Sequence, residues 1–109
     1  MNEIRAYLYT ISDDGAVNVH EGTYSPPRNH WGRQGRFCPD KGQWSFVSSE
    51  PGEVYYRKIW LRERDDERVK RIYLDYHRRK IEELERRIDL HRRTAVALLE
   101  EIENGNLSI

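Results

Sequence analysis

Basic and aromatic residues are interleaved in the segment from Tyr24 to Trp44, which has no hydrophobic period. Arginine binds phosphate oxygens through paired hydrogen bonds, and aromatic rings stack on nucleobases. Gly32 and Gly35 would let the backbone approach a ligand and present its amides to an anion. These residue types indicate a site for a nucleotide or another phosphate-bearing ligand. The expected ligand-binding residues are Arg28, Trp31, Arg33, Arg36, Phe37, Trp44 and, from the neighbouring strand, Arg57.

The same residues also fit an exposed loop whose aromatic side chains anchor it to a sheet, or a loop that binds another protein. The segment Gly32–Gly35 matches neither the Walker pattern nor the GxGxxG fingerprint. Clustered cations are unfavourable unless something anionic lies between them. At the level of the sequence, all three interpretations stay open.

No combination of residues in this sequence has the pattern of a catalytic group. Cys38 and His30 lie in one segment and could be a nucleophile and a base. However, Cys38 precedes Pro39, and no residue suggests itself as the third group that would orient the base. The carboxylates cluster on the charged C-terminal segment, where salt bridges are their usual role. A single cysteine excludes an intramolecular disulfide, and no Cys/His spacing suits a metal. We therefore expect a protein that is not an enzyme and has no cofactor or metal.

The composition limits the kinds of partner. The 109-residue chain balances 19 basic against 19 acidic residues, which argues against a duplex DNA binder and disfavours a single-strand binder. Charged residues make up 35% of the chain, which suits a long exposed helix that needs a partner for its apolar stripe. There is no apolar run of signal-peptide or membrane-span length. We expect a cytoplasmic protein of a prokaryotic host cell, without a membrane partner.

The fold class expected is α+β, beginning with a four-stranded antiparallel β-meander in residues 1–63. Alternating apolar residues place the strands at residues 4–11, 17–24, 44–48 and 53–61. An Asp-Gly turn at Gly15 and a Pro-Gly turn at Gly52 would close two hairpins. Consecutive prolines end the second strand. Residues 25–43 are therefore predicted to be one long loop, and loops of this length are usually functional or disordered.

Residues 64–104 contain no glycine or proline and are predicted to form one long helix, followed by a short tail at 105–109. Asp65 or Asp66 would cap its start, and Gly105 would end it. About forty residues at about 1.5 Å each give roughly 60 Å, more than a domain of this size can cover. A fold-back after Arg93 into two helices stays open, although no turn residue marks it.

From Leu74 onward the apolar residues keep a strict 3-4 spacing over four heptads, which is typical of a coiled coil. Residues 69–76 instead have the spacing of a helix face that lies on a sheet. His77 and His91 occupy core positions, where they would set the register or, in a parallel pair, face each other. We expect a homodimer or larger assembly of either orientation. The expected interface residues are Leu74, His77, Ile81, Leu84, Ile88, His91, Ala95, Leu98 and Ile102.

Residues 54–66 (VYYRKIWLRERDD) run from the meander directly into a long charged helix. This layout resembles small proteins carried by phages and other mobile elements. Among these it is similar to anti-defence proteins that oligomerise and sequester cyclic nucleotide signals, such as the Thoeris anti-defence sponges. The resemblance covers the architecture of the whole chain and carries over no binding residues. It implies a homo-oligomeric phage protein that sequesters a nucleotide immune signal. The alternative is an inhibitor or adaptor that binds a protein through its helix or aromatic sheet face.

Overall fold

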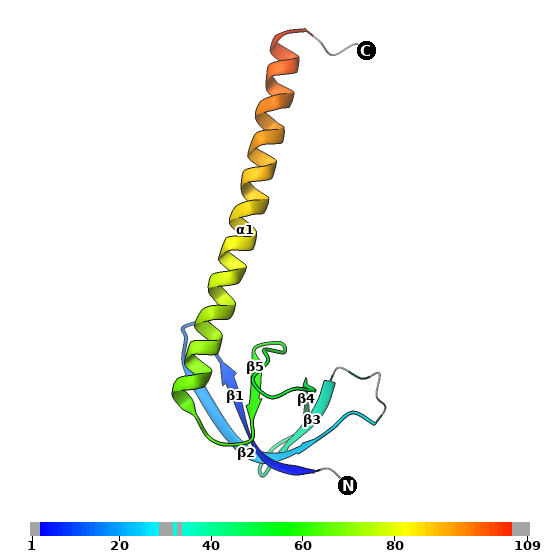
Figure 1. Cartoon of the computed structure of the whole chain (residues 1–109), viewed down its shortest axis with the longest axis vertical. Helices are drawn as coiled ribbons and strands as arrows, with labels where there is room; N and C mark the ends of the chain where they lie inside the picture. The colour runs from blue at the N-terminus through cyan, green and yellow to red at the C-terminus, as the bar shows by residue number, and fades with distance from the viewer. Residues whose placement is uncertain (1–2, 29–31, 33, 106–109) are drawn as a thin grey trace. The chain divides into compact units, whose positions relative to one another are not determined.

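The computed structural model describes residues 3–28, 32 and 34–105, and its architecture is α+β (Figure 1). Five antiparallel strands form a curled sheet, and one helix follows them in the sequence. The elements are β1 (Ile4–Ile11), β2 (Val17–Ser25), β3 (Gln34–Pro39), β4 (Ser45–Ser48), β5 (Lys58–Leu61) and α1 (Asp66–Glu103). The chain divides into two compact units, residues 1–75 and 76–109, and each is described by itself.

The strand order in the sheet is β4-β3-β2-β1-β5, so each of the first three strands pairs with the next and β5 returns to β1. The two edge strands also meet each other. Trp60 of β5 donates from Nε1 to the carbonyl oxygen of Ser48 at the end of β4, at 2.7 Å. The amide of Gly52 donates to the carbonyl oxygen of Trp60 at 2.9 Å. These bonds join the edges of the curled sheet.

The sheet has five strands, so the prediction of four was wrong, and the additional strand lies in the segment predicted to be a loop. β3 pairs with both β2 and β4. Its residues alternate as strand residues do, with Gly35 and Phe37 buried and Arg36 exposed. The alternation of apolar and polar residues is hard to recognise in this sequence, because a glycine takes one of the inward positions and the strand is only six residues long.

The predicted strand at residues 53–61 is also shorter than expected, because its first half contains a tight turn. Tyr55 and Lys58 exchange backbone hydrogen bonds of 2.8 and 2.9 Å around Tyr56 and Arg57. Both central residues have positive φ, 46° and 68°. Only Lys58–Leu61 continues as a strand, paired with β1.

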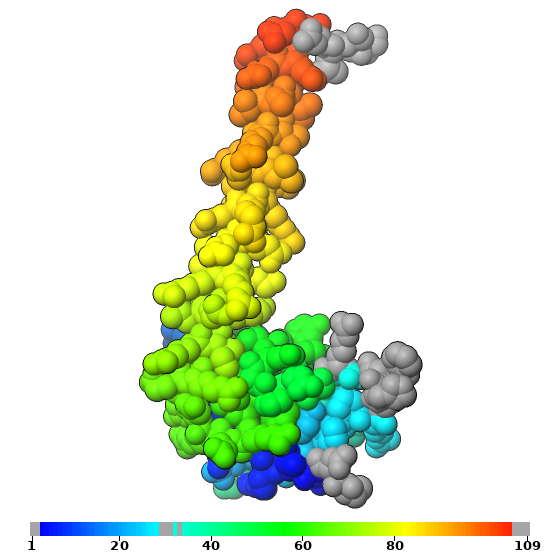
Figure 2. Space-filling view, in the orientation of Figure 1, coloured from blue at the N-terminus to red at the C-terminus, as the bar shows by residue number. Residues whose placement is uncertain are grey.

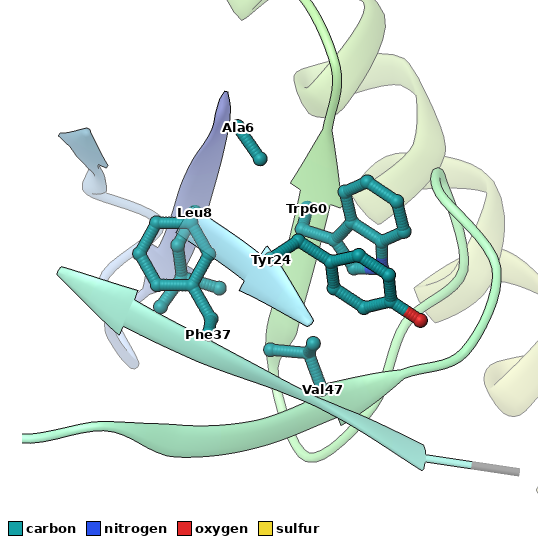
Figure 3. Close-up of a cluster of buried hydrophobic side chains, with 6 residues drawn as sticks. All are labelled: Ala6, Leu8, Tyr24, Phe37, Val47 and Trp60. Atoms are coloured by element: carbon teal, nitrogen blue, oxygen red, sulfur yellow. The ribbon is translucent and has the colours of Figure 1, made fainter. Parts of the chain in front are cut away.

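One face of the sheet encloses the first hydrophobic core (Figure 3). The rings of Tyr24 and Trp60 stack with centroids 3.8 Å apart and planes 11° apart. A Cβ atom at Gly35 would lie 2.4 Å from the ring of Tyr24, so only glycine allows β3 to pass this close. The buried members of this core are Ala6, Leu8, Tyr24, Phe37, Val47 and Trp60.

The second core lies between the other face of the sheet and the first turns of α1, as the spacing of residues 69–76 predicted. Val69 and Tyr73 pack against Tyr9, Ile59 and Leu61. The Tyr73 hydroxyl donates to the carbonyl oxygens of Tyr9, at 3.2 Å, and Arg57. Burial raises the pKa of the Tyr73 phenol. Both faces of the sheet are therefore used for packing.

Helix α1 begins as predicted, with Asp65 as its cap. The Asp65 carboxylate accepts a hydrogen bond from the amide of Arg68 at 3.0 Å. The helix is continuous for 38 residues, so it does not fold back after Arg93. Gly105 follows its end with a φ of 67°, the conformation that glycine adopts readily. The predicted tail beyond it, residues 106–109, lies outside the described residues.

The second unit is the part of the chain from residue 76 onward, most of which is helix (Figure 2, yellow to red). Several of its large apolar side chains are exposed. Six of the predicted interface residues are between 49% and 60% exposed: Leu74, Ile81, Leu84, Ile88, Leu98 and Ile102. Within the described residues, no helix has the length and apolarity needed to cross a membrane.

Candidate functional site

Three side chains gather on the solvent-facing side of β3 and β4, and we call them the Arg36 cluster: Arg36, Trp44 and Phe46. Arg36 pairs directly with Phe46 across the two strands. The guanidinium carbon of Arg36 lies 4.9 Å from the centroid of the Trp44 ring, within cation–π range. The rings of Trp44 and Phe46 meet edge to face at 5.0 Å. These two rings are 49% and 39% exposed, so they remain accessible to a ligand.

A groove of about 230 Å³ adjoins the Arg36 cluster where β2 leads toward β3. Arg28 and Arg36 supply its cations, and Phe46 supplies an aromatic wall. Ligand pockets usually have volumes of about 300–1,000 Å³, so this groove holds part of a ligand rather than enclosing all of it. Its lining residues are Pro26, Pro27, Arg28, Gly32, Gln34, Gly35, Arg36 and Phe46.

The two groove arginines differ in their charge environment from Arg5, Arg57 and Arg64. Arg5 binds both carboxylate oxygens of Asp40 at 2.8 Å, and this hydrogen-bonded pairing lowers the pKa of Asp40. Arg64 pairs with Asp66 at 3.2 Å. Arg28 and Arg36, by contrast, form no ion pair with any residue of the described ranges. Their positive charge is therefore left for a bound anion.

The structure brings three of the predicted ligand-binding residues, Arg28, Arg36 and Trp44, to this part of the sheet. Trp31 and Arg33 lie outside the described residues, so the prediction for them is untested.

The prediction that Phe37 stacks on a ligand is not compatible with its position. Phe37 is fully buried in the first core, where it pairs across the strands with Tyr24. The alternation of β3 places Phe37 inward for the same reason that it places Arg36 outward.

Arg57 lies in the turn before β5 rather than in the groove lining. Its guanidinium forms an ion pair with Asp13, and its carbonyl oxygen accepts a hydrogen bond from Tyr73. An arginine already paired with a carboxylate is a weaker candidate for a phosphate contact.

Phe46 and Gln34 are site residues that the sequence interpretation missed. The signal for Phe46 was present, because it alternates with the buried Val47 in a correctly predicted strand. Gln34 could not be predicted, because it lies in β3, a strand in the segment that was predicted to be a loop.

The turn at Tyr56 and Arg57 is connected to the groove through Tyr55, whose hydroxyl donates to Oε1 of Gln34. Two-residue hairpin turns with positive φ at both positions normally use Asn and Gly, and bulky residues there are strained by about 1–3 kcal/mol each. The ion pair to Asp13 and the bond from Tyr73 hold this conformation. Its result is that Tyr56 projects into solvent, 80% exposed.

The chemistry that this arrangement offers is binding. Guanidinium groups bind phosphate or carboxylate oxygens, and the exposed rings stack on a planar group. Within the described residues there is no group of three or more His, Cys, Asp or Glu side chains that could hold a metal ion. In comparisons with known proteins, no protein family, curated protein or solved structure matches this chain.

Proposed function

We propose that this protein is a cytoplasmic, non-enzymatic, homo-oligomeric binding protein that sequesters a small phosphate-bearing ligand on the outer face of β3 and β4. One observation carries the proposal. Arg28 and Arg36, which have no acidic partner in the described ranges, line one groove with the exposed ring of Phe46, and Arg36 also lies over the exposed ring of Trp44.

The ligand contacts follow from this geometry. A phosphate group would lie between Arg28 and Arg36, where two cations share one groove. A base would stack on Trp44 or Phe46, and base–aromatic stacking contributes about 1–3 kcal/mol. Holding Arg36 against Trp44 limits its rotamer freedom, so less entropy is lost when it binds the anion.

The ligand class that fits both halves of the site is a nucleotide. The resemblance in layout to anti-defence sponges adds a narrower proposal, in which the ligand is a cyclic nucleotide immune signal and the protein belongs to a phage. Sequestration requires only tight binding, which agrees with a site made of cationic and aromatic groups.

Isothermal titration calorimetry tests the proposal with inorganic phosphate, nucleoside monophosphates and cyclic dinucleotides as probes. We expect at least one nucleotide to bind, and Arg36→Ala and Trp44→Ala each to weaken that binding at least tenfold. Arg62→Ala is the matched control, because Arg62 is an exposed arginine of the same unit that does not line the groove. Equal losses in all three variants, or no heat with any probe, would exclude this site.

A second candidate function is an inhibitor or adaptor that binds another protein, and the strained turn favours it. Tyrosine is a common hot-spot residue, and Tyr56 is held outward at a cost in backbone strain. Affinity purification with wild-type protein and Tyr56→Ala distinguishes the two functions. A protein partner that co-purifies with the wild type but not with Tyr56→Ala supports the adaptor. A nucleotide that co-purifies with both proteins supports the sequestering protein.

A further inference from the structure

The second unit presents a continuous apolar seam with no cover among the described residues. In heptad notation, position a holds Ile81, Ile88, Ala95 and Ile102, and position d holds His77, Leu84, His91 and Leu98. The large aliphatic members of this seam are about half exposed. A helix with such a stripe needs a second helix against it. The charges beside the seam determine which helix fits and in which direction.

We infer that residues 77–102 pair with the same segment of a second copy in antiparallel orientation, with Ile88 of each copy against His91 of the other. This inference rests on the homo-oligomeric part of the proposed function and is independent of the ligand. It also commits to one of the two orientations that the sequence left open.

The observation that favours the antiparallel orientation is the pattern of charges at the flanking positions e and g. Position e holds Arg78, Glu85, Arg92 and Leu99, and position g holds Lys80, Arg87, Thr94 and Glu101. In coiled coils these positions form the ion pairs that select partner and orientation.

Four of these flanking charges are not used within the helix. Arg78, Glu85, Arg92 and Glu101 form no ion pair with residues of the described ranges, whereas the flanking Lys80 and Arg87 each pair with Glu83 of their own helix. Asp89 and Arg93 lie 2.6 Å apart, and this pairing occupies the one carboxylate within reach of Arg92. The unpaired charges are thus available to a partner helix.

A parallel pair would use these charges poorly. There, position g faces position e of the next heptad on the partner. Lys80 would meet Glu85 of the partner, which is favourable, but Arg87 would meet Arg92 of the partner, which is not. Each histidine would also face the same histidine of the partner.

The antiparallel pair has only favourable charge contacts. When Ile88 faces His91 of the partner, Glu85 faces Arg92 of the partner and Lys80 faces Glu101 of the partner. Two-fold symmetry repeats both pairs. The remaining flanking pairs each match a charged residue with a neutral one, Arg78 with Leu99 and Arg87 with Thr94.

The hydrophobic layers agree with this register. Ile81 faces Leu98 of the partner, and the large Leu84 faces the small Ala95, which fills the seam evenly. A shift of one heptad in one direction would place Arg87 against its own copy. A shift in the other direction would place Arg92 against its own copy. The register with Ile88 against His91 avoids both.

Cysteine cross-linking tests the orientation. Cys38 is exposed, so Cys38→Ser is the background for Ile81→Cys and Leu98→Cys. In the antiparallel pair the two copies of position 81 lie about 25 Å apart along the axis, and so do the two copies of position 98. This distance exceeds the span of a short bis-maleimide, so neither variant cross-links alone. A co-refolded mixture of the two variants cross-links efficiently. Cross-linking of either variant by itself would establish the parallel pair and overturn the inference.

Charge reversal gives an independent readout, because the two orientations predict opposite signs. In the antiparallel pair, Arg92→Glu faces Glu85 twice, and the dimer weakens on the order of tenfold. Adding Glu85→Arg restores the affinity. In the parallel pair, Arg92→Glu would remove a repulsion and tighten the dimer. Arg86→Glu, on the outer face, is the control for the change in net charge, and sedimentation equilibrium measures each dissociation constant.

A wild-type protein that sediments as a monomer at micromolar concentration would remove the homo-oligomeric part of the proposed function together with this inference. Nucleotide binding by such a monomer would leave the ligand proposal standing. The two failures are therefore distinguishable in the same preparation.

Discussion

Tyr9 and Asp66 connect strand β1 to the first turn of the helix. The Tyr9 hydroxyl donates to Oδ1 of Asp66 at 2.9 Å and accepts a hydrogen bond from the amide of Asp65 at 2.9 Å. Tyr9 is itself fully buried in the second core. One side chain thus fixes the place at which α1 begins.

Tyr9→Phe is expected to lower the free energy of unfolding by about 1–3 kcal/mol, because it leaves the Asp65 amide without its partner and removes a bond to a carboxylate. Urea denaturation followed by tryptophan fluorescence measures the loss. Tyr7→Phe is the control, since the Tyr7 hydroxyl makes no hydrogen bond to a described residue. Equal stability of the two variants would contradict a positioning role for Tyr9.

Asp66 should make stability depend on pH in the acid range. Hydrogen bonds from Arg64 and then from Tyr9 hold the pKa of Asp66 below its ordinary value of 3.8. A pKa lowered by folding stabilises the native state above the unfolded-state pKa, and this contribution is lost as the pH falls through the folded-state value. The stability difference between wild type and Asp66→Asn should therefore be largest near neutral pH and vanish in strong acid. A difference independent of pH would show that the carboxylate charge is not the cause, and Glu67→Gln serves as the control.

The double variant Ile81→Asp, Ile88→Asp should be monomeric by light scattering and should lose helical circular dichroism. A carboxylate in a dry seam without a partner costs several kcal/mol, more than the pairing of two helices provides. Leu90→Asp, at an exposed position off the seam, should leave the assembly intact. Dimers that persist in the double variant would place the interface elsewhere.

His91→Leu should tighten the assembly. In the inferred pair the ring of His91 lies against Ile88 of the partner, and an aliphatic side chain at that position buries no polar nitrogen. Sedimentation equilibrium at one fixed pH should therefore give a lower dissociation constant for this variant than for the wild type. An unchanged dissociation constant would mean that His91 lies outside the interface.

The helix could be predicted from the sequence because its signals are local and agree with one another. An aspartate cap, forty residues without glycine or proline, and a terminal glycine all indicate the same element. The change of spacing near Leu74 also separated the sheet-packing face from the exposed seam. Such periodic patterns need no knowledge of distant parts of the chain.

The sheet was harder to predict because its deciding contacts join residues that are distant in sequence. β3 can lie in the sheet because Gly35 lets it pass close to the ring of Tyr24, and no local sequence pattern predicts that contact. The turn at Tyr56 and Arg57 uses residue types that turn statistics disfavour. The candidate site inherited these errors, so Phe37 was expected at the surface while Phe46, on the outer face of β4, was missed.

The closure of the sheet edges has a consequence for strand addition by another chain. An exposed edge strand is a template for strand addition by another chain and a frequent origin of aggregation. Here β4 and β5 are only four residues each, and the bonds from Trp60 and Gly52 occupy two of their backbone acceptors, the carbonyl oxygens of Ser48 and Trp60. Strand addition at these edges is thereby disfavoured, so the proposed self-association would use side-chain contacts, whose geometry can close.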